Sequence, residues 1–314
     1  MVTDPLSDIL ALLRPRSAIS VGLDIAGDWC FSFPSHVGIK FNAVMHGECY
    51  LRMDGSETWH HLRQGSCFLL TLGLPFTLAS DPSLPPRPAA ILYRDVTGPV
   101  ANFNGGGDLF LIGGRFTFEG EGAALLAALP PVLLLDSVSP EASVLQWSLT
   151  QLTDELRQHR PGGALLSEHL AHLMLVHILR LYLERAAPGE VSWLQALADR
   201  HLGRALSALH AEPARSWTLA ELAARAGLSR TVFAERFRRV VGLSAGDYLI
   251  RWRMLLARDR LRHTADGIGQ IALSVGYQSE AAFSTAFKRV TDLSPRQYRR
   301  GMDATPRMLV STSS

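Results

Sequence analysis

The last third of the chain contains an internal repeat, which limits the available folds more than any other feature. Residues 219–249 align with residues 268–299, first at an offset of 49 and, after one extra residue in the second copy, at an offset of 50. The identities at the offset of 50 are Ser229, Phe233, Phe237, Arg239, Val240, Leu243, Ser244 and Tyr248, which match Ser279, Phe283, Phe287, Arg289, Val290, Leu293, Ser294 and Tyr298. Two copies of one small helical unit are therefore expected.

Each copy has the local chemistry of two short helices joined by a tight turn. Gly227 and Gly276 are expected to end the first helix, because the residue after a helix C-terminus often needs a positive φ. Ser229 and Ser279 follow as candidate N-caps of the second helix. The residues of the first copy expected to anchor the second helix in the core are Phe233, Phe237 and Val240. This pattern predicts a tandem pair of helix-turn-helix motifs.

The second helix of each copy leaves one face free, and that face suits a DNA major groove about 12 Å wide. The predicted base-reading residues are Arg230, Thr231, Ala234, Glu235, Glu280, Ala281, Ser284 and Thr285. Basic residues further along each helix are placed to meet phosphates. The predicted phosphate contacts are Arg238, Arg239, Lys288 and Arg289. For any single residue, the alternative is a solvated position with no DNA contact.

The charge distribution supports a polyanionic partner for this segment. Residues 215–301 carry 16 Lys and Arg against 7 Asp and Glu, whereas the rest of the chain carries 15 against 22. A basic segment beside an acidic remainder indicates binding to nucleic acid. The helix predicted between the two copies is about 27 Å long. Recognition helices that read successive turns of one DNA face lie about 34 Å apart, so we expect the DNA to bend when both dock.

The rest of the chain has two other patterns. Residues 1–120 contain short β-branched and aromatic segments separated by Gly, Pro, Asp and Asn, which predicts an antiparallel sandwich or barrel. Residues 122–212 have apolar residues at helical spacing, and the middle helix is apolar around most of its girth. It could pack against a second subunit or form a core helix within one chain. We predict an α+β chain whose parts are a β-barrel domain over 1–135, a helical linker and dimerisation region over 136–212, an all-α double helix-turn-helix domain over 213–301 and a flexible tail over 302–314.

Residues 216–301 resemble the DNA-binding domain of the AraC/XylS family of bacterial transcription regulators. The second copy carries the family pattern most closely, at Ile268, Ile271, Ala272, Gly276, Tyr277, Ser279, Phe283, Phe287, Lys288, Arg289, Ser294, Pro295, Tyr298 and Arg299. The resemblance implies a seven-helix domain that binds double-stranded promoter DNA and usually activates transcription. It also implies a homodimer that works with RNA polymerase.

The upstream segments DPLSDILALLRPRS, HGECYLRMDG, RQGSCFLL and GGRFTFEG resemble the cupin-like half of one branch of this family. That resemblance implies a small β-barrel that senses an unidentified small molecule. The candidate effector-binding residues are Phe41, Met45, His46, Tyr50, Trp59 and Phe68. Metal-binding cupins carry a His-x-His pair, whereas this chain has only His46 with Glu48, and a later expected histidine is Phe76. We therefore expect no metal, no cofactor and no enzyme activity.

The three cysteines, Cys30, Cys49 and Cys67, offer an alternative function in which the regulator senses oxidants or electrophiles. Cys49 and Cys67 are predicted on adjacent strands and could form a reversible disulfide, although free cysteine is commonly a small buried hydrophobe. Relatives in the same branch often carry cysteine where this chain has Gly113, which weakens the redox alternative.

The expected location is the cytoplasm, in association with the nucleoid. Asp4 and Asp8 occupy the place where a signal peptide needs positive charge. The sequence contains no uninterrupted run of 18 apolar residues, so we expect no membrane span. A low, odd number of cysteines suits a reducing compartment. His169, His172 and His177 share the middle helix without a further ligand nearby, so we expect a polar stripe or interface there.

Overall fold

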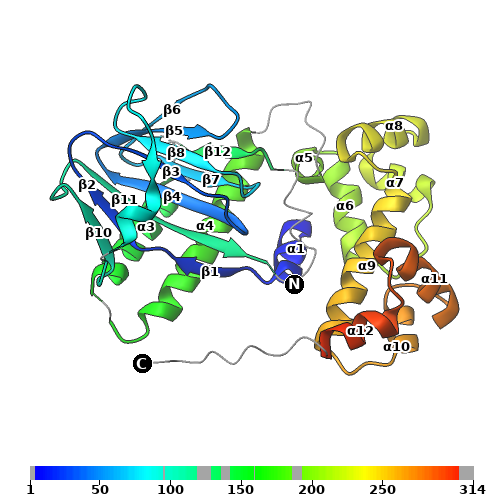
Figure 1. Cartoon of the computed structure of the whole chain (residues 1–314). Coiled ribbons are helices and arrows are strands. Elements are labelled where there is room, and N and C mark those ends of the chain that lie inside the picture. Colours follow the sequence, from blue (N-terminus) through cyan, green and yellow to red (C-terminus); the bar gives the residue numbers. More distant parts are fainter. Residues whose placement is uncertain are drawn as a thin grey trace. The chain divides into compact units, whose positions relative to one another are not determined.

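A computed structural model describes residues 4–94, 96–118, 129–135, 142–158, 160–185 and 193–303. Their contacts divide the chain into two compact units (Figure 1). The β-rich unit is Leu13–Ala187, and the helical unit combines Met1–Leu12 with Pro188–Ser314. The predicted flexible tail over 302–314 and the predicted boundary at residue 136 lie almost entirely outside the described residues.

The β-rich unit is built from two sheets. The larger one is ordered β10-β2-β11-β4-β7-β12, with β1 also paired to β11, and the smaller one is ordered β6-β5-β8-β3-β9. The strands of the larger sheet are β1 Arg16–Ile19, β2 Gly22–Ile25, β4 Ile39–His46, β7 Cys67–Leu70, β10 Val100–Phe103, β11 Leu109–Thr117 and β12 Val132–Leu135. Those of the smaller sheet are β3 Cys30–Phe33, β5 Glu48–Met53, β6 His60–Arg63, β8 Phe76–Ala79 and β9 Arg87–Pro88, followed by the 3-10 helix η1 Ala89–Tyr93. Most neighbouring strands are antiparallel, as the turn-rich sequence predicts.

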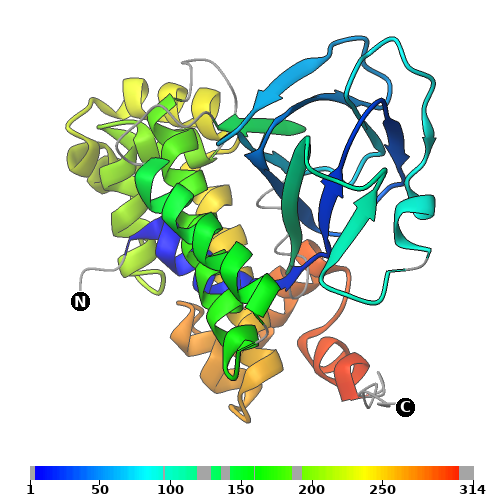
Figure 2. The ribbon, with the colours of Figure 1, turned by 90° about the vertical axis from the view of Figure 1, so that its left-hand side faces the viewer.

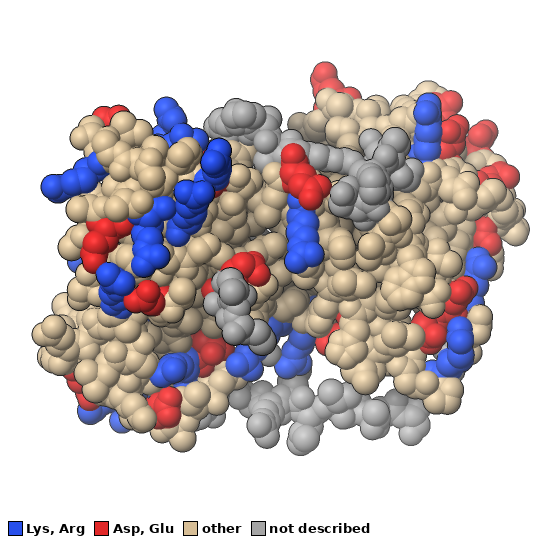
Figure 3. Space-filling model, turned by 180° about the vertical axis from the view of Figure 1, so that it is seen from behind, with Lys and Arg blue, Asp and Glu red and all other residues tan. Residues whose placement is uncertain are grey.

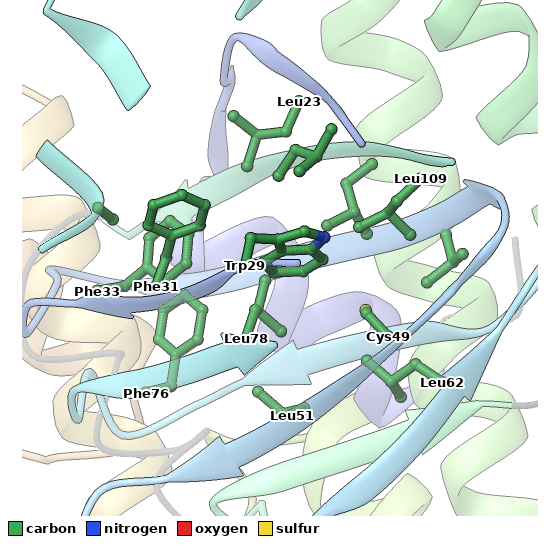
Figure 4. Close-up of a cluster of buried hydrophobic side chains, with 14 of the residues drawn as sticks. Leu23, Trp29, Phe31, Phe33, Cys49, Leu51, Leu62, Phe76, Leu78 and Leu109 are labelled. Atoms are coloured by element: carbon green, nitrogen blue, oxygen red, sulfur yellow. The ribbon is translucent and has the colours of Figure 1, made fainter. Parts of the chain in front are cut away.

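One apolar core lies between the two sheets (Figure 4). β5 contributes to it with a period of two: Cys49, Leu51 and Met53 are buried, whereas the residues between them are more exposed. Phe33 stacks on Phe76 with ring centroids 4.6 Å apart. The two sheets therefore enclose a flattened barrel that is filled with side chains at the labelled positions.

Two long helices, α3 (Ala142–Gln158) and α4 (Gly163–Arg185), pack side by side (Figure 2) and also contact the larger sheet. The Arg157 guanidinium lies 4.5 Å from the ring centroid of Phe110 on β11. A Cβ added to Gly22 of β2 would lie 3.3 Å from Leu156. The larger sheet is thus covered by the core on one face and by helices on the other.

The apolar character of α4 bears on the expectation that no segment spans a membrane. Its segment Gly163–Glu184 is long and apolar enough to cross a membrane, with a mean hydropathy of 1.2, and 39% of that segment is buried within the protein. The core helix of a water-soluble protein meets the same criteria, and α4 packs against α3, β1 and β12. Length and composition alone therefore do not assign it to a membrane.

The helical unit contains α1 and the described helices of the C-terminal part. Their bounds are α1 Pro5–Leu13, α5 Trp193–Ala198, α6 Leu202–Ala211, α7 Leu219–Ala226, α8 Arg230–Val241, α9 Ala245–His263, α10 Ile268–Ser274, α11 Glu280–Thr291 and α12 Pro295–Asp303. α5 packs against α8, and α6 packs against α7. These two helices, which the sequence analysis grouped with the linker, therefore belong to the same compact unit as the predicted double helix-turn-helix domain. The α+β fold class is confirmed.

Candidate DNA interface

The first helix-turn-helix consists of α7 and α8. Thr218 and Glu221 form a capping box at the start of α7. Gly227 adopts a φ of +67° after the last residue of α7, and the Ser229 hydroxyl accepts a hydrogen bond from the Val232 amide at 3.4 Å. The predicted roles of Gly227 and Ser229 are confirmed.

The second helix-turn-helix consists of α10 and α11 and repeats this geometry. Gly276 follows α10 with a φ of +85°, and the Ser279 hydroxyl accepts from the Ala282 amide at 3.2 Å. Phe283 and Phe287 are fully buried, with ring centroids 5.5 Å apart. The two motifs therefore present their second helices in the same way.

The equivalent anchors in α8 differ from the prediction at one position. Phe233 and Phe237 are fully buried, as expected. The third buried residue of α8 is Val241, whereas Val240 is only partly buried. The buried positions of α8 are therefore spaced i, i+4, i+8, whereas the prediction was i, i+4, i+7.

The faces of α8 and α11 that lie opposite the buried phenylalanines are largely exposed to solvent. Most of the twelve predicted contact residues are exposed, and the two that are partly buried are Ala234 and Ser284. Figure 3 shows Lys and Arg side chains gathered over the surface of the helical unit. The geometry brings the predicted residues together on two faces, and their contacts with DNA remain a prediction.

Two side chains on α11 have internal partners. The Glu280 carboxylate lies 3.4 Å from an Arg296 guanidinium nitrogen on α12. The Thr285 hydroxyl donates a hydrogen bond to the Ala281 carbonyl at 3.0 Å. Glu280 Oε1 is therefore shared with Arg296 while its second carboxylate oxygen can still accept, and the Thr285 hydroxyl can still accept but has used its donor.

A salt bridge that the sequence analysis missed holds α8 in place. The Arg236 guanidinium on α8 contacts the Asp199 carboxylate at 2.7 Å. Asp199 also accepts hydrogen bonds from the amides of His201 and Leu202 at the start of α6. These hydrogen bonds and Arg236 outweigh the effect of burial and lower the pKa of Asp199. Asp199 is charged at neutral pH and links α6 to the first recognition helix.

The segment 212–217, between α6 and α7, contacts the second helix-turn-helix. Arg253 on α9 donates to the carbonyls of Pro213 at 2.7 Å and Arg215 at 2.9 Å. A Cβ added to Gly276 would lie 2.4 Å from the Ala214 carbonyl oxygen, so only glycine fits this turn. The 212–217 segment, which leads into the first motif, therefore contacts α9 through Arg253 and the second motif at Gly276.

The His210 imidazole joins α6 to α9. Its Nε2 lies 2.8 Å from the Tyr248 hydroxyl, and its ring stacks on Trp252 with centroids 3.9 Å apart. Nδ1 lies 3.4 Å from the Asp8 carboxylate of α1 but forms no hydrogen bond. Burial lowers the pKa of His210 to about 3, so the ring is neutral at neutral pH.

The neutral His210 makes the stability of the helical unit depend on pH. The unfolded chain takes up the proton near pH 6.5 and the folded chain only near pH 3, so the free energy of unfolding falls as the pH falls between these values. From pH 6.5 to pH 5 the expected loss is about 2 kcal/mol. Urea unfolding of wild type and His210→Gln at pH 7 and pH 5 isolates this contribution, because other groups cancel in the difference. An equal loss in both proteins would contradict the assignment.

The predicted effector-binding residues are dispersed in the β-rich unit. Phe68 alone belongs to the core between the sheets. Phe41 is fully buried but lies on the other face of β4, with its ring centroid 5.2 Å from that of Phe116. Met45 is partly buried, and His46 is exposed at the end of β4.

Tyr50 and Trp59 face away from the core. Tyr50 stacks on His61, with centroids 4.7 Å apart, and Trp59 lies 4.7 Å below the Arg52 guanidinium. Alternation along β5 sends Tyr50 and Arg52 to the face opposite Leu51. Phe41, Tyr50 and Trp59 therefore do not face the core between the sheets, and effector binding by the six candidates stays a prediction.

The cysteines are poorly suited to sensing. Cys49 and Cys67 are fully buried, and burial raises the pKa of both thiols to about 12. Cys30 is buried as well, and its pKa is also raised. Because the thiolate is the reactive form, these thiols are nearly inert at neutral pH. The predicted adjacency of Cys49 and Cys67 is wrong, since they lie in different sheets.

No group of three or more His, Cys, Asp and Glu side chains that could hold a metal occurs among the described residues. Near the cupin-like motif, the His61 imidazole pairs with the Glu48 carboxylate at 3.1 Å. His46 of that motif is exposed and takes no part in this pair.

Comparisons with known proteins agree with this architecture. Residues 4–184 match the Cupin family and residues 222–301 match the Helix-turn-helix domain family. A Streptomyces lividans protein that carries the name AraC-like transcription regulator is 44% identical over 299 residues, which are 95% of this chain and 98% of the relative. The HTH-type transcriptional regulator MtrA of Neisseria gonorrhoeae is 28% identical over 302 residues, with coverages of 95% and 98%.

Among solved structures, the DNA-binding domain of AdpA in complex with a target DNA is 28% identical, covers 34% of this chain and 96% of that chain, and has a TM-score of 0.33. The family assignment rests on the long sequence matches. The chain belongs to the AraC-like transcription regulators and combines a cupin domain with a DNA-binding helix-turn-helix domain.

Proposed function

We propose that this regulator is a dimeric transcription activator of the cytoplasm, associated with the nucleoid, which binds two successive major grooves and responds to a small molecule in its cupin domain. The observation that carries the proposal is the pair of open faces on α8 and α11, each with a hydroxyl-capped N-terminus and basic residues at its C-terminal end. α9, of 19 residues and about 28 Å long, lies between the two motifs in the chain. RNA polymerase is the proposed partner in activation, and no catalysis is proposed.

Exposed apolar side chains support a dimer formed through α3 and α4. Trp147 is 55% exposed, Leu165 60% and Leu173 37%. Homodimer interfaces are more apolar than the rest of a protein surface, so these exposed residues are candidates for such an interface. We expect a second copy to cover this surface.

The experiment that tests this function is selection of bound fragments from a random duplex pool by the full chain. We expect enriched duplexes with two conserved blocks about one helical turn apart. A reporter promoter that carries such a duplex should then be more active when the chain is present. If the selection enriches no sequence, even at low salt concentration, the proposal is wrong.

A further inference from the structure

The second helices of the two motifs carry opposite charges at equivalent positions of the repeat. At the offset of 50 that relates the copies, Arg230 opens α8 and Glu280 opens α11. Both side chains are exposed. A guanidinium donates two hydrogen bonds to the N7 and O6 acceptors of guanine, whereas a carboxylate can only accept. The two helices therefore offer opposite chemistry to the base edges in the major groove.

The Glu280 carboxylate has a partner within the helical unit. Its Oε1 lies 3.4 Å from an Arg296 guanidinium nitrogen on α12. Its second oxygen is left to accept from an amino group on a base edge, and in the major groove that group is N4 of cytosine or N6 of adenine. Guanine and thymine present acceptors there, so Glu280 disfavours both at the base that it faces.

The outer face of α11 carries methyl groups one turn apart, at Ala281 and Thr285. Both residues are exposed, whereas Phe283 and Phe287 between and after them are fully buried. The Thr285 hydroxyl donates to the Ala281 carbonyl at 3.0 Å, so its proton is already used. The same hydrogen bond fixes the direction of the Thr285 methyl group. In the major groove, such groups match the C5-methyl of thymine.

The first two turns of α11 offer few side-chain donors for a base. Glu280 and Ala282 have none, and Thr285 has used its own. The Ser284 hydroxyl can donate but is partly buried. The first cation of the helix, Lys288, follows only in the third turn. The paired donors that read guanine are therefore missing from this part of α11, in contrast to Arg230 on α8.

We propose that α11 reads its half of the DNA site through thymine methyl groups, which contact the Thr285 methyl group and the Cβ of Ala281. Glu280 selects cytosine or adenine at the base that it faces. α8 reads a different sequence, because Arg230 donates to guanine. The DNA site thus consists of two unlike blocks, although the two motifs of the chain are copies. This inference rests on the proposed function and specifies the chemistry of each half-site.

The test measures the affinity of the full chain for modified versions of one selected duplex by fluorescence anisotropy. Each thymine is replaced in turn by deoxyuridine, which lacks only the C5-methyl, and each guanine by 7-deazaguanine, which lacks the N7 acceptor. In one block, deoxyuridine should lower the affinity about 4-fold for each contacted methyl group, the value expected for burial of one such group. In the other block, 7-deazaguanine should lower it about 5-fold at the guanine that Arg230 contacts.

Thr285→Ser assigns the deoxyuridine-sensitive block to α11, because serine keeps the hydroxyl and removes only the methyl group. At the contacted thymine, deoxyuridine should cost this variant less than about 2-fold, since both changes remove the same contact. Thr264→Ser is the matched control. Thr264 is exposed before α10, and its hydroxyl donates to the Arg260 carbonyl at 2.9 Å, as that of Thr285 does to Ala281. The control should keep the sensitivity of the wild type.

Two results would overturn the inference. One is a selected duplex in which no deoxyuridine lowers the affinity by more than about 2-fold. The other is a loss on deoxyuridine that is equal in wild type and Thr285→Ser at every thymine. In both cases the chain has still selected a sequence, so the proposed function stands. A selection that enriches no sequence removes the proposed function itself, and the two failures are thereby distinguished.

Discussion

Replacing Arg239 and Arg289 together with alanine is expected to lower the affinity of the chain for every DNA duplex by about 60-fold at 0.1 M salt. Both side chains are exposed at equivalent positions of the two recognition helices. Each phosphate contact contributes about 0.9 to the slope of log K against log salt, so loss of one contact reduces K about 8-fold at this concentration. The measurement is fluorescence anisotropy with a selected and a scrambled duplex over a range of salt concentrations.

The control for this prediction is Arg251→Ala, which removes an exposed arginine from α9 and should leave the slope unchanged. Thr231→Ala and Ser284→Ala should instead alter the preference between sequences, because base contacts carry the specificity. If the arginine and hydroxyl variants lose affinity in the same proportion on every duplex, the division into phosphate and base contacts is incorrect.

Replacing Phe287 with alanine is expected to lower the free energy of unfolding of the helical unit by about 3–5 kcal/mol. Phe287 is fully buried, and its ring centroid lies 5.5 Å from those of Phe283 and Tyr298. A loss of this size is a large part of the stability of an ordinary domain. The measurement is urea unfolding followed by the helical circular dichroism signal, together with a footprint on a selected duplex.

The internal repeat supplies a matched comparison for that result. Phe237→Ala removes the equivalent ring from the first motif, and we expect a similar loss of stability. Leu273→Ala, at a position that is 64% exposed on α10, should change stability by less than about 0.5 kcal/mol. A footprint that shortens equally from both ends in the two phenylalanine variants would show that the motifs do not act as separate readers.

The repeat could be predicted from the sequence because its determinants are local. Gly227 and Gly276 end helices through their own backbone conformation, and Ser229 and Ser279 cap the helices that follow within three residues. Such features need no knowledge of distant segments. They identified the two motifs, their exposed faces and the fold class.

Contacts between distant segments were not visible in the same way. In the sequence, Arg236 looks like any other helix residue. Its role depends on the folded structure, where Asp199 lies 2.7 Å from it. Arg253 likewise has a role only because residues 213 and 215 return to α9. Nothing in the spacing of these residues along the chain indicates that they meet.

The sequence pattern of β4 did not show which face of the strand borders the core, for a specific reason. Ile39, Phe41 and Ala43 alternate with Lys40 and Asn42, which ordinarily means apolar residues inside and polar residues outside. Because helices cover the outer face of the larger sheet, the apolar face of β4 can turn toward them, and its polar face then lies between the sheets. An alternating pattern states which residues share a face but not which face borders the core between the sheets.

The 212–217 segment sets a practical limit on chimeras. A graft that joined the DNA-reading half to a foreign receptor at residue 213 would discard Asp199 and His210 and sever the chain at the carbonyl that Arg253 holds. A junction placed before Trp193, ahead of α5, would keep these three contacts within the transplanted part, and α1, which belongs to the same unit, would have to be supplied with it.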